Sequence, residues 1–161
     1  DCLLSRGLGD VYKRQSRGSK IMARIVLTDV SVTVNAIDLS QFLTSITLST
    51  SVDVVETTGM SSAAAKTRLP GLKDNSVTLE FNQDFAAAGP EITINAVGAS
   101  LVGTVVPIVI KPTSGAVSAT NPSFAFSAVC SEWQNLQGGV GELSTISATW
   151  PITGAITKTV A

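Results

Sequence analysis

Apolar side chains recur at every second position over long parts of the chain, and this pattern predicts a mainly β fold. Apolar and polar residues alternate in five stretches, at 30–34, 46–54, 77–81, 123–134 and 143–150. Because successive side chains of a strand point to opposite faces, such alternation indicates strands with one buried face. At 161 residues without an internal repeat, the chain is expected to form one domain, a β-sandwich or a small β-barrel.

The positions of three prolines predict further features of the fold. Pro90 followed by Glu91 is a helix-start signal, so we expect one flanking α-helix at 90–101. Pro107 lies inside the β-branched run 105–111 and cannot donate a ladder hydrogen bond. That run is therefore expected to be an edge strand or to carry a bulge, and Pro151 is expected to end the last strand.

The alternation stops between residues 56 and 75, which predicts a long loop between two strong strands. Loops of this length are uncommon in compact domains and are usually functional or disordered. Pro70-Gly71 is compatible with a type II turn. A projecting loop could bind a neighbouring subunit, and a mobile surface loop is an equally good interpretation. The candidate inter-subunit residues are Thr57, Thr58, Gly59, Met60, Arg68, Leu69, Pro70, Gly71, Lys73 and Asp74.

The composition excludes most catalytic systems, and no enzymatic activity is expected. The chain has no histidine, which removes histidine-based acid–base catalysis, histidine-activated nucleophiles and histidine-ligated metals. No phosphate-binding loop, CxxC pair or calcium loop occurs, so neither a cofactor nor a metal is expected. Cys2 and Cys130 are the only cysteines, and Cys130 follows the apolar parity of its strand, as a core residue would.

Other polar and aromatic candidates have simpler interpretations. Asp53 and Glu56 are a carboxylate pair of a kind common on solvated surfaces, and Asp84 and Glu91 are expected near the helix start. Trp133 and Trp150 lie near strand ends, where closure of the core is favoured over an interface hot spot. No apolar stretch reaches the roughly 20 residues that a membrane-spanning helix needs.

The chain carries few charges for its size, and many of its polar residues are serine or threonine. Only 14% of residues are charged, against about 25% in an average soluble domain. Because charged residues are depleted at the centres of protein interfaces, this surface is compatible with extensive contact with other protein. A threonine-rich β-domain with an ordinary surface is the alternative. The net charge of −1 gives no basic footprint for nucleic-acid binding.

Residues 1–21 differ in character from the rest and are expected to be a non-native or disordered leader, before a single domain at 22–161. Residues 1–15 resemble translated sequencing-adapter read-through. The leader holds five of the eleven basic residues and two of the twelve acidic ones. The remainder therefore has a net charge of −4.

The segment Arg68-Leu69-Pro70-Gly71-Leu72-Lys73-Asp74 ahead of a strand is the most specific of several that share one resemblance. The others lie at 22–27, 32–35 with 38–40, 110–113 ahead of 120–122, and 146–152 before Gly154. Together they resemble the major tail tube proteins of long-tailed, siphovirus-type bacteriophages, notably those that infect actinobacteria, and the resemblance covers 22–161. The family often has a bulky aromatic residue before the loop glycine, where this chain has Thr58.

The resemblance implies a structural virion protein of the tail tube. Six subunits would close into a ring, and rings would stack into a conduit through which phage DNA passes without specific binding. The 56–75 segment would reach the adjacent ring, and the inner wall would be acidic. Tape-measure and tail terminator proteins would be the partners. The alternatives are a tail terminator, a head decoration protein, or a cell-surface adhesion module of β-sandwich type.

Overall fold

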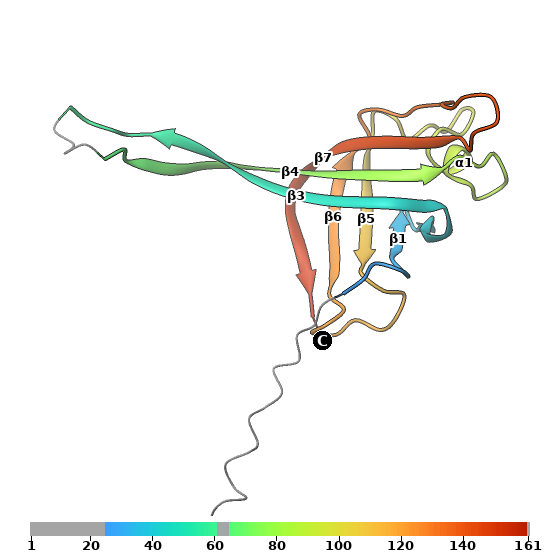
Figure 1. The fold of residues 1–161 in the computed structure, drawn as a ribbon, viewed down its shortest axis with the longest axis horizontal. Helices are drawn as coiled ribbons and strands as arrows, with labels where there is room; N and C mark the ends of the chain where they lie inside the picture. The colour runs from blue at the N-terminus through green and yellow to red at the C-terminus, as the bar shows by residue number, and fades with distance from the viewer. Residues whose placement is uncertain (1–24, 61–64, 161) are drawn as a thin grey trace, which may run out of the picture.

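One continuous antiparallel sheet dominates the computed structural model, which describes residues 25–60 and 65–160 (Figure 1). The expected leader at 1–21 lies outside the described residues. Within them, seven strands are ordered β2-β1-β5-β6-β7-β4-β3, beside one α-helix and one short 3₁₀ helix. The elements are β1 Ser31–Val34, β2 Ile37–Asp38, η1 Ser40–Phe42, β3 Leu43–Glu56, β4 Arg68–Asn82, α1 Pro90–Ile94, β5 Val105–Lys111, β6 Ser123–Val129 and β7 Thr145–Thr159. The predicted mainly β class with one helix is confirmed.

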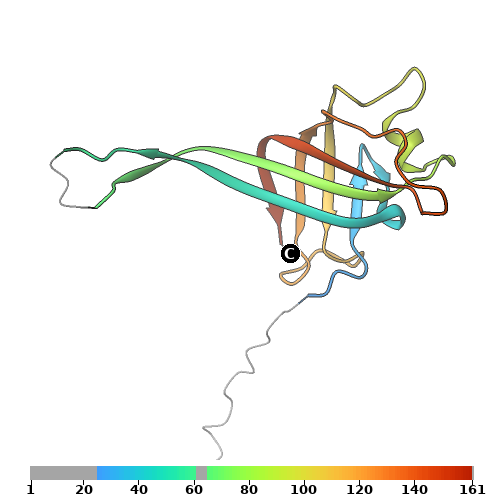
Figure 2. The same cartoon turned by 45° about the horizontal axis from the view of Figure 1, so that its top comes forward.

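Strand β7 bends and joins the two halves of the sheet around one core (Figure 2). Its first part pairs with β4 up to Pro151, and its second part pairs with β6 from Ile152 onward. The expectation that Pro151 ends the strand was wrong. A proline cannot donate to a ladder, and here it marks the point where β7 leaves one neighbour for the other. Gly154, with φ of 81°, lies in the irregular stretch that follows.

The core forms where the apolar faces of the two halves meet. Most of the alternating residues predicted from the sequence point inward, whereas Val52 and Val54 of β3 are exposed. Those with no exposed surface include Val32, Val34, Val77, Leu79, Phe81, Ala128, Cys130, Ala148 and Trp150. Complete burial of a large apolar side chain stabilises the fold by about 1.5–3 kcal/mol, so these residues fix the strand register.

Strand β5 is a central strand whose register is continuous on both sides, so the edge strand or bulge that Pro107 predicted was wrong. It pairs with β1 on one side and with β6 on the other. The carbonyl of Pro107 accepts the N–H of Asn35, which belongs to the turn after β1. Because N and C=O of a strand residue point to the same side, the proline nitrogen faces this turn, where the β1 ladder has already ended. No ladder hydrogen bond is lost.

Helix α1 begins at Pro90, as predicted, but ends at Ile94 rather than at residue 101. Asn95 closes it by donating its backbone N–H to the Glu91 carbonyl, and Gly98 then adopts φ of 78°. Ile92, Thr93 and Ile94 are β-branched and favour helix extension weakly, and the helix ends directly after them.

Candidate functional site

Strands β3 and β4 form a long hairpin whose outer half extends well beyond the body of the protein (Figure 1). They have 14 and 15 residues, whereas strands of globular proteins most often have about 5–6. Pairing continues from Leu43 opposite Phe81 to Glu56 opposite Arg68. All described residues from Thr50 to Asp74 are exposed. The expected loop at 56–75 is thus mostly strand, and only 57–67 connects the two.

Apolar side chains line the outer half of this hairpin. Val54 is 63% exposed, Leu69 59% and Leu72 80%. Val54 and Val55 are successive strand residues, so their side chains lie on opposite faces, and both faces of the hairpin are apolar. An isolated two-stranded hairpin is marginally stable in water, and clustered exposed apolar residues mark interaction sites. The hairpin therefore has the composition of a surface that other protein covers.

A bulge lies halfway along the hairpin and explains Gly71. The register shifts between Val52 and Val54, which pair with Lys73 and Pro70. An added Cβ on Gly71 would lie 3.1 Å from the Cβ of Asp53 and 3.2 Å from its carbonyl oxygen. The glycine thus permits a close approach of the two strands. The predicted type II turn at Pro70-Gly71 is replaced by this bulge.

Hydrogen bonds between threonines and one salt bridge hold the described part of the hairpin tip together. The Thr57 N–H donates to the Thr67 carbonyl over 2.9 Å, and the Thr67 N–H donates to Thr58 Oγ1 over 3.1 Å. Lys66 forms a salt bridge of 3.3 Å with Glu56. Residues 61–64 lie outside the described part of the chain.

The structure separates the ten predicted contact residues into two groups on one hairpin. Thr57, Thr58, Gly59 and Met60 belong to the connection, while Arg68, Leu69, Pro70, Gly71, Lys73 and Asp74 belong to β4. Sequence reasoning missed Val52, Val54 and Val55, the exposed valines of β3. The alternation of Val52 and Val54 with polar residues predicts a half-buried strand. The length of this strand beyond the last core residue is the sequence signal that could have indicated an exposed hairpin.

Basic residues concentrate on the hairpin, whereas the body is acidic. Five lysines and arginines lie in the described ranges, and three of them, Lys66, Arg68 and Lys73, belong to the hairpin. Within those ranges, the Lys66–Glu56 contact is the only salt bridge. Arg68 and Lys73 thus have no carboxylate partner among the described residues.

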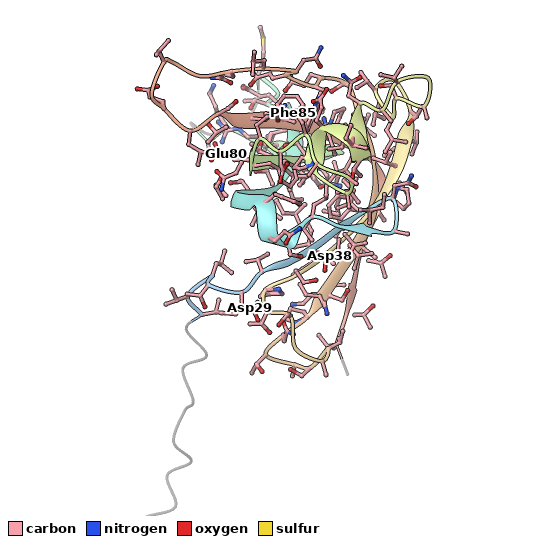
Figure 3. All side chains as sticks on the ribbon, turned by 90° about the vertical axis from the view of Figure 1, so that its right-hand side faces the viewer. Asp29, Asp38, Glu80 and Phe85 are labelled. Atoms are coloured by element: carbon pink, nitrogen blue, oxygen red, sulfur yellow. The ribbon has the colours of Figure 1, made fainter. Side chains whose placement is uncertain are left out.

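A groove runs beside the inner half of β3, between this edge strand and the other half of the sheet. One part, of about 460 Å³, is mostly apolar and is lined by β3 and by the ends of β5, β6 and β7. A second part, of about 580 Å³, shares Leu27, Val30 and Ile46 with the first and contains Asp29 and Asp38. Both aspartates are labelled in Figure 3, where they lie on the same side of the molecule.

Hydrogen bonds keep Asp38 charged. The Ser40 hydroxyl and backbone N–H both donate to Asp38 Oδ1, and Lys111 adds a favourable charge, so the pKa of this carboxyl is lowered from 3.8. Asp29 accepts the hydroxyl of Ser114. The groove thus has an apolar part and an anionic part.

The remaining sequence candidates have structural roles. Trp150 is fully buried and donates to the Glu132 carbonyl over 2.8 Å, so it closes the core as predicted. Glu91 lies in the first turn of α1, as predicted, but Asp84 instead caps the preceding turn by accepting the Ala86 N–H over 2.8 Å. Asp53 and Glu56 are three apart in a strand and therefore face opposite sides.

The described ranges hold neither a candidate metal site nor a candidate membrane-spanning helix. They contain no group of three histidine, cysteine, aspartate or glutamate residues that could hold a metal ion. They also contain no helix with the length and apolarity needed to cross a membrane.

Solved structures that are similar to this chain include chains from the SPP1 tail tube and from gene transfer agent particles. The SPP1 tail tube matches with a TM-score of 0.64 at 15% identity, covering 86% of this chain and 80% of that chain. A chain of the native gene transfer agent virion matches with a TM-score of 0.60 at 14% identity, covering 82% of this chain and 96% of that chain. A chain of the gene transfer agent tail, determined with C6 symmetry, matches with a TM-score of 0.52 at 15% identity, covering 74% of this chain and 83% of that chain. No family model and no curated protein sequence matches this chain.

Proposed function

We propose that this protein is a tail tube subunit, a structural and non-enzymatic component of a virion that polymerises as stacked rings. The observation that carries the proposal is the hairpin of β3 and β4, whose apolar outer half has no cover in the monomer. Burial of exposed apolar surface drives association, and head-to-tail contacts between identical copies close into rings or extend as filaments.

The structural comparisons support the same assembly. The fold is shared with the SPP1 tail tube over 86% of this chain. The C6 symmetry of the gene transfer agent tail supports six copies in each ring. The sequence resemblance to tail tube proteins, notably those of actinobacterial phages, supports tape-measure and tail terminator proteins as partners. The hairpin is the proposed contact to the adjacent ring.

The outer face of β3, β4 and β7 has the chemistry of a DNA conduit. Its side chains are mostly hydroxyls, and the face includes the carboxylate of Glu80. No lysine or arginine occurs in 43–50, 75–82 or 145–151. DNA binds proteins by exchanging counterions for basic side chains, so a wall without cations lets DNA pass without specific binding. We propose that this face lines the lumen. Its residues include Thr47, Ser49, Ser76, Thr78, Ser147 and Thr149.

Electron microscopy and sedimentation of the purified protein test the function. We expect hollow tubes of uniform diameter that form above a threshold concentration. Single rings that do not stack would favour a tail terminator or a head decoration protein. A strictly monomeric protein at high concentration would contradict the proposal.

A further inference from the structure

We propose that the hairpin of one copy docks in the groove beside β3 of the next copy. The inference deepens the proposed function and rests on it, because it identifies the surface that receives the hairpin. The hairpin side of the contact is the outer half of the two paired strands, residues 51–56 of β3 and 68–74 of β4. The receiving side is the open groove between β3 and the ends of β5, β6 and β7.

The groove is an unfilled continuation of the hydrophobic core. Ile46 and Leu48 of β3 form one wall, and Phe124 and Ile156 of the other half of the sheet form the opposite wall. All four side chains pack against the core cluster but remain partly exposed. Each would lose its remaining contact with water if an apolar segment lay between the walls, which favours occupation of the groove.

The hairpin supplies a segment with matching chemistry. Val52 and Val54 follow Ile46 and Leu48 along the same face of β3, with exposed fractions of 40% and 63%. A paired two-stranded ribbon is a preformed insert, because the backbone groups that face each other across the hairpin are already hydrogen-bonded. The outward-facing backbone groups of its two edges need partners in the groove or in water.

The charges of the two surfaces are complementary. Arg68 and Lys73 extend from the hairpin without a carboxylate partner among the described residues. Asp29 and Asp38 line the anionic part of the groove. Lys158 lies at the apolar part, where it stacks 5.8 Å from the centre of the Phe124 ring, and the hairpin offers Asp53. Such complementarity selects the partner and its register more than it adds affinity.

A hairpin that occupies the groove must come from a second copy. Ile46 and Leu48 line the groove, and the hairpin continues the same strand away from it (Figure 1). A copy could fill its own groove only by folding β3 back and losing its pairing with β4. A protruding apolar element and a separate apolar groove on one chain produce a heterologous contact that repeats from copy to copy.

Disulfide trapping in assembled tubes tests the docking. The paired substitutions Val54→Cys and Ile156→Cys are introduced into a Cys2→Ser background, with the buried Cys130 retained. On mild oxidation with oxidised glutathione we expect a ladder of covalently linked oligomers that a reductant removes. A second pair, Val54→Cys with Lys158→Cys, uses an exposed residue of the groove. It should give the same ladder even if Ile156→Cys fails to fold.

The control pairs Val54→Cys with Thr149→Cys, which lies on the opposite face of the sheet. We expect this variant to form tubes without a ladder. If the groove pairs form tubes without a ladder, or if the control links equally well, the docking site is wrong while the tube function stands. If the unsubstituted protein forms no tubes, the proposed function itself fails, and the docking fails with it.

Discussion

The indole N–H of Trp133 donates to Oε2 of Glu91 over 2.6 Å, and this contact links the segment after β6 to helix α1. The same carboxylate accepts the side-chain amides of Asn95 over 3.0 Å and of Gln83 over 3.4 Å. Glu91 is only 9% exposed. Hydrogen bonds to amides and to an indole, rather than a cation, therefore compensate this carboxylate for its loss of water.

Replacement of Trp133 by phenylalanine removes that donor and leaves an aromatic ring beside Phe81, whose centre is 6.4 Å away. Because a hydrogen bond to a charged group contributes about 1.5–3 kcal/mol, we expect the free energy of unfolding to fall by about that amount. Urea denaturation measures it. Phe85→Leu, at an exposed aromatic residue, is the control. An unchanged midpoint for Trp133→Phe would mean that the contact does not stabilise the fold.

Replacement of residues 57–67 by Asn-Gly should leave a folded monomer that fails to polymerise. The core residues all lie elsewhere, and Asn-Gly forms the two-residue turn that joins paired strands. Circular dichroism checks the fold, and sedimentation velocity measures assembly. Tubes formed by this variant would show that the hairpin tip is not required for stacking.

Burial makes the Cys130 thiol unreactive in the native protein. Desolvation raises its pKa from 9.0 to about 11, which leaves about a hundredfold less thiolate at pH 8. In a Cys2→Ser variant, we expect a disulfide reagent to modify Cys130 slowly in buffer and rapidly in urea. Because the folded pKa is raised, the stabilising contribution is complete below pH 9 and is lost as the pH rises toward 11. Equal modification rates in both solvents would contradict the buried position.

A cation placed on the proposed lumen face should make the tube retain DNA. Thr149 is exposed there, and its hydroxyl lies 2.9 Å from that of Thr78. Tubes of Thr149→Lys should bind double-stranded DNA at low salt and release it as salt increases, because counterion release drives such binding. Unsubstituted tubes should not bind DNA, and Thr149→Gln is the uncharged control. Equal DNA binding by Thr149→Lys and Thr149→Gln would place this face outside the lumen.

The core residues, and the face of each strand that is buried, could be predicted from the sequence because they depend on side-chain alternation. Val77, Leu79 and Phe81 were predicted inside, and all three are completely buried. The start of α1 was also predictable, since Pro90 and Glu91 are local signals. Its end at Ile94 was not, because no proline or glycine stands there and the β-branched residues Ile92, Thr93 and Ile94 only weaken the helix.

The long hairpin was not predictable in the same way. Beyond the body, β3 and β4 have no buried face, so the alternation that marks other strands is absent from Lys66 to Asp74. Pairing there depends on the neighbouring strand and on a bulge at Gly71, which are relationships between distant positions. The predictions from Pro107 and Pro151 were wrong for a related reason. The effect of a proline on a strand depends on which neighbouring strand its missing N–H would face, and this is not visible in the sequence.

A cryo-electron microscopy reconstruction of the assembled protein tests the central claim most directly. The account predicts a hollow tube with six copies in each ring, in which the hairpin of β3 and β4 crosses the ring boundary and is covered by a copy of the next ring. Tubes whose rings contact each other through other surfaces, with Val54 and Leu69 still exposed to solvent, would contradict it.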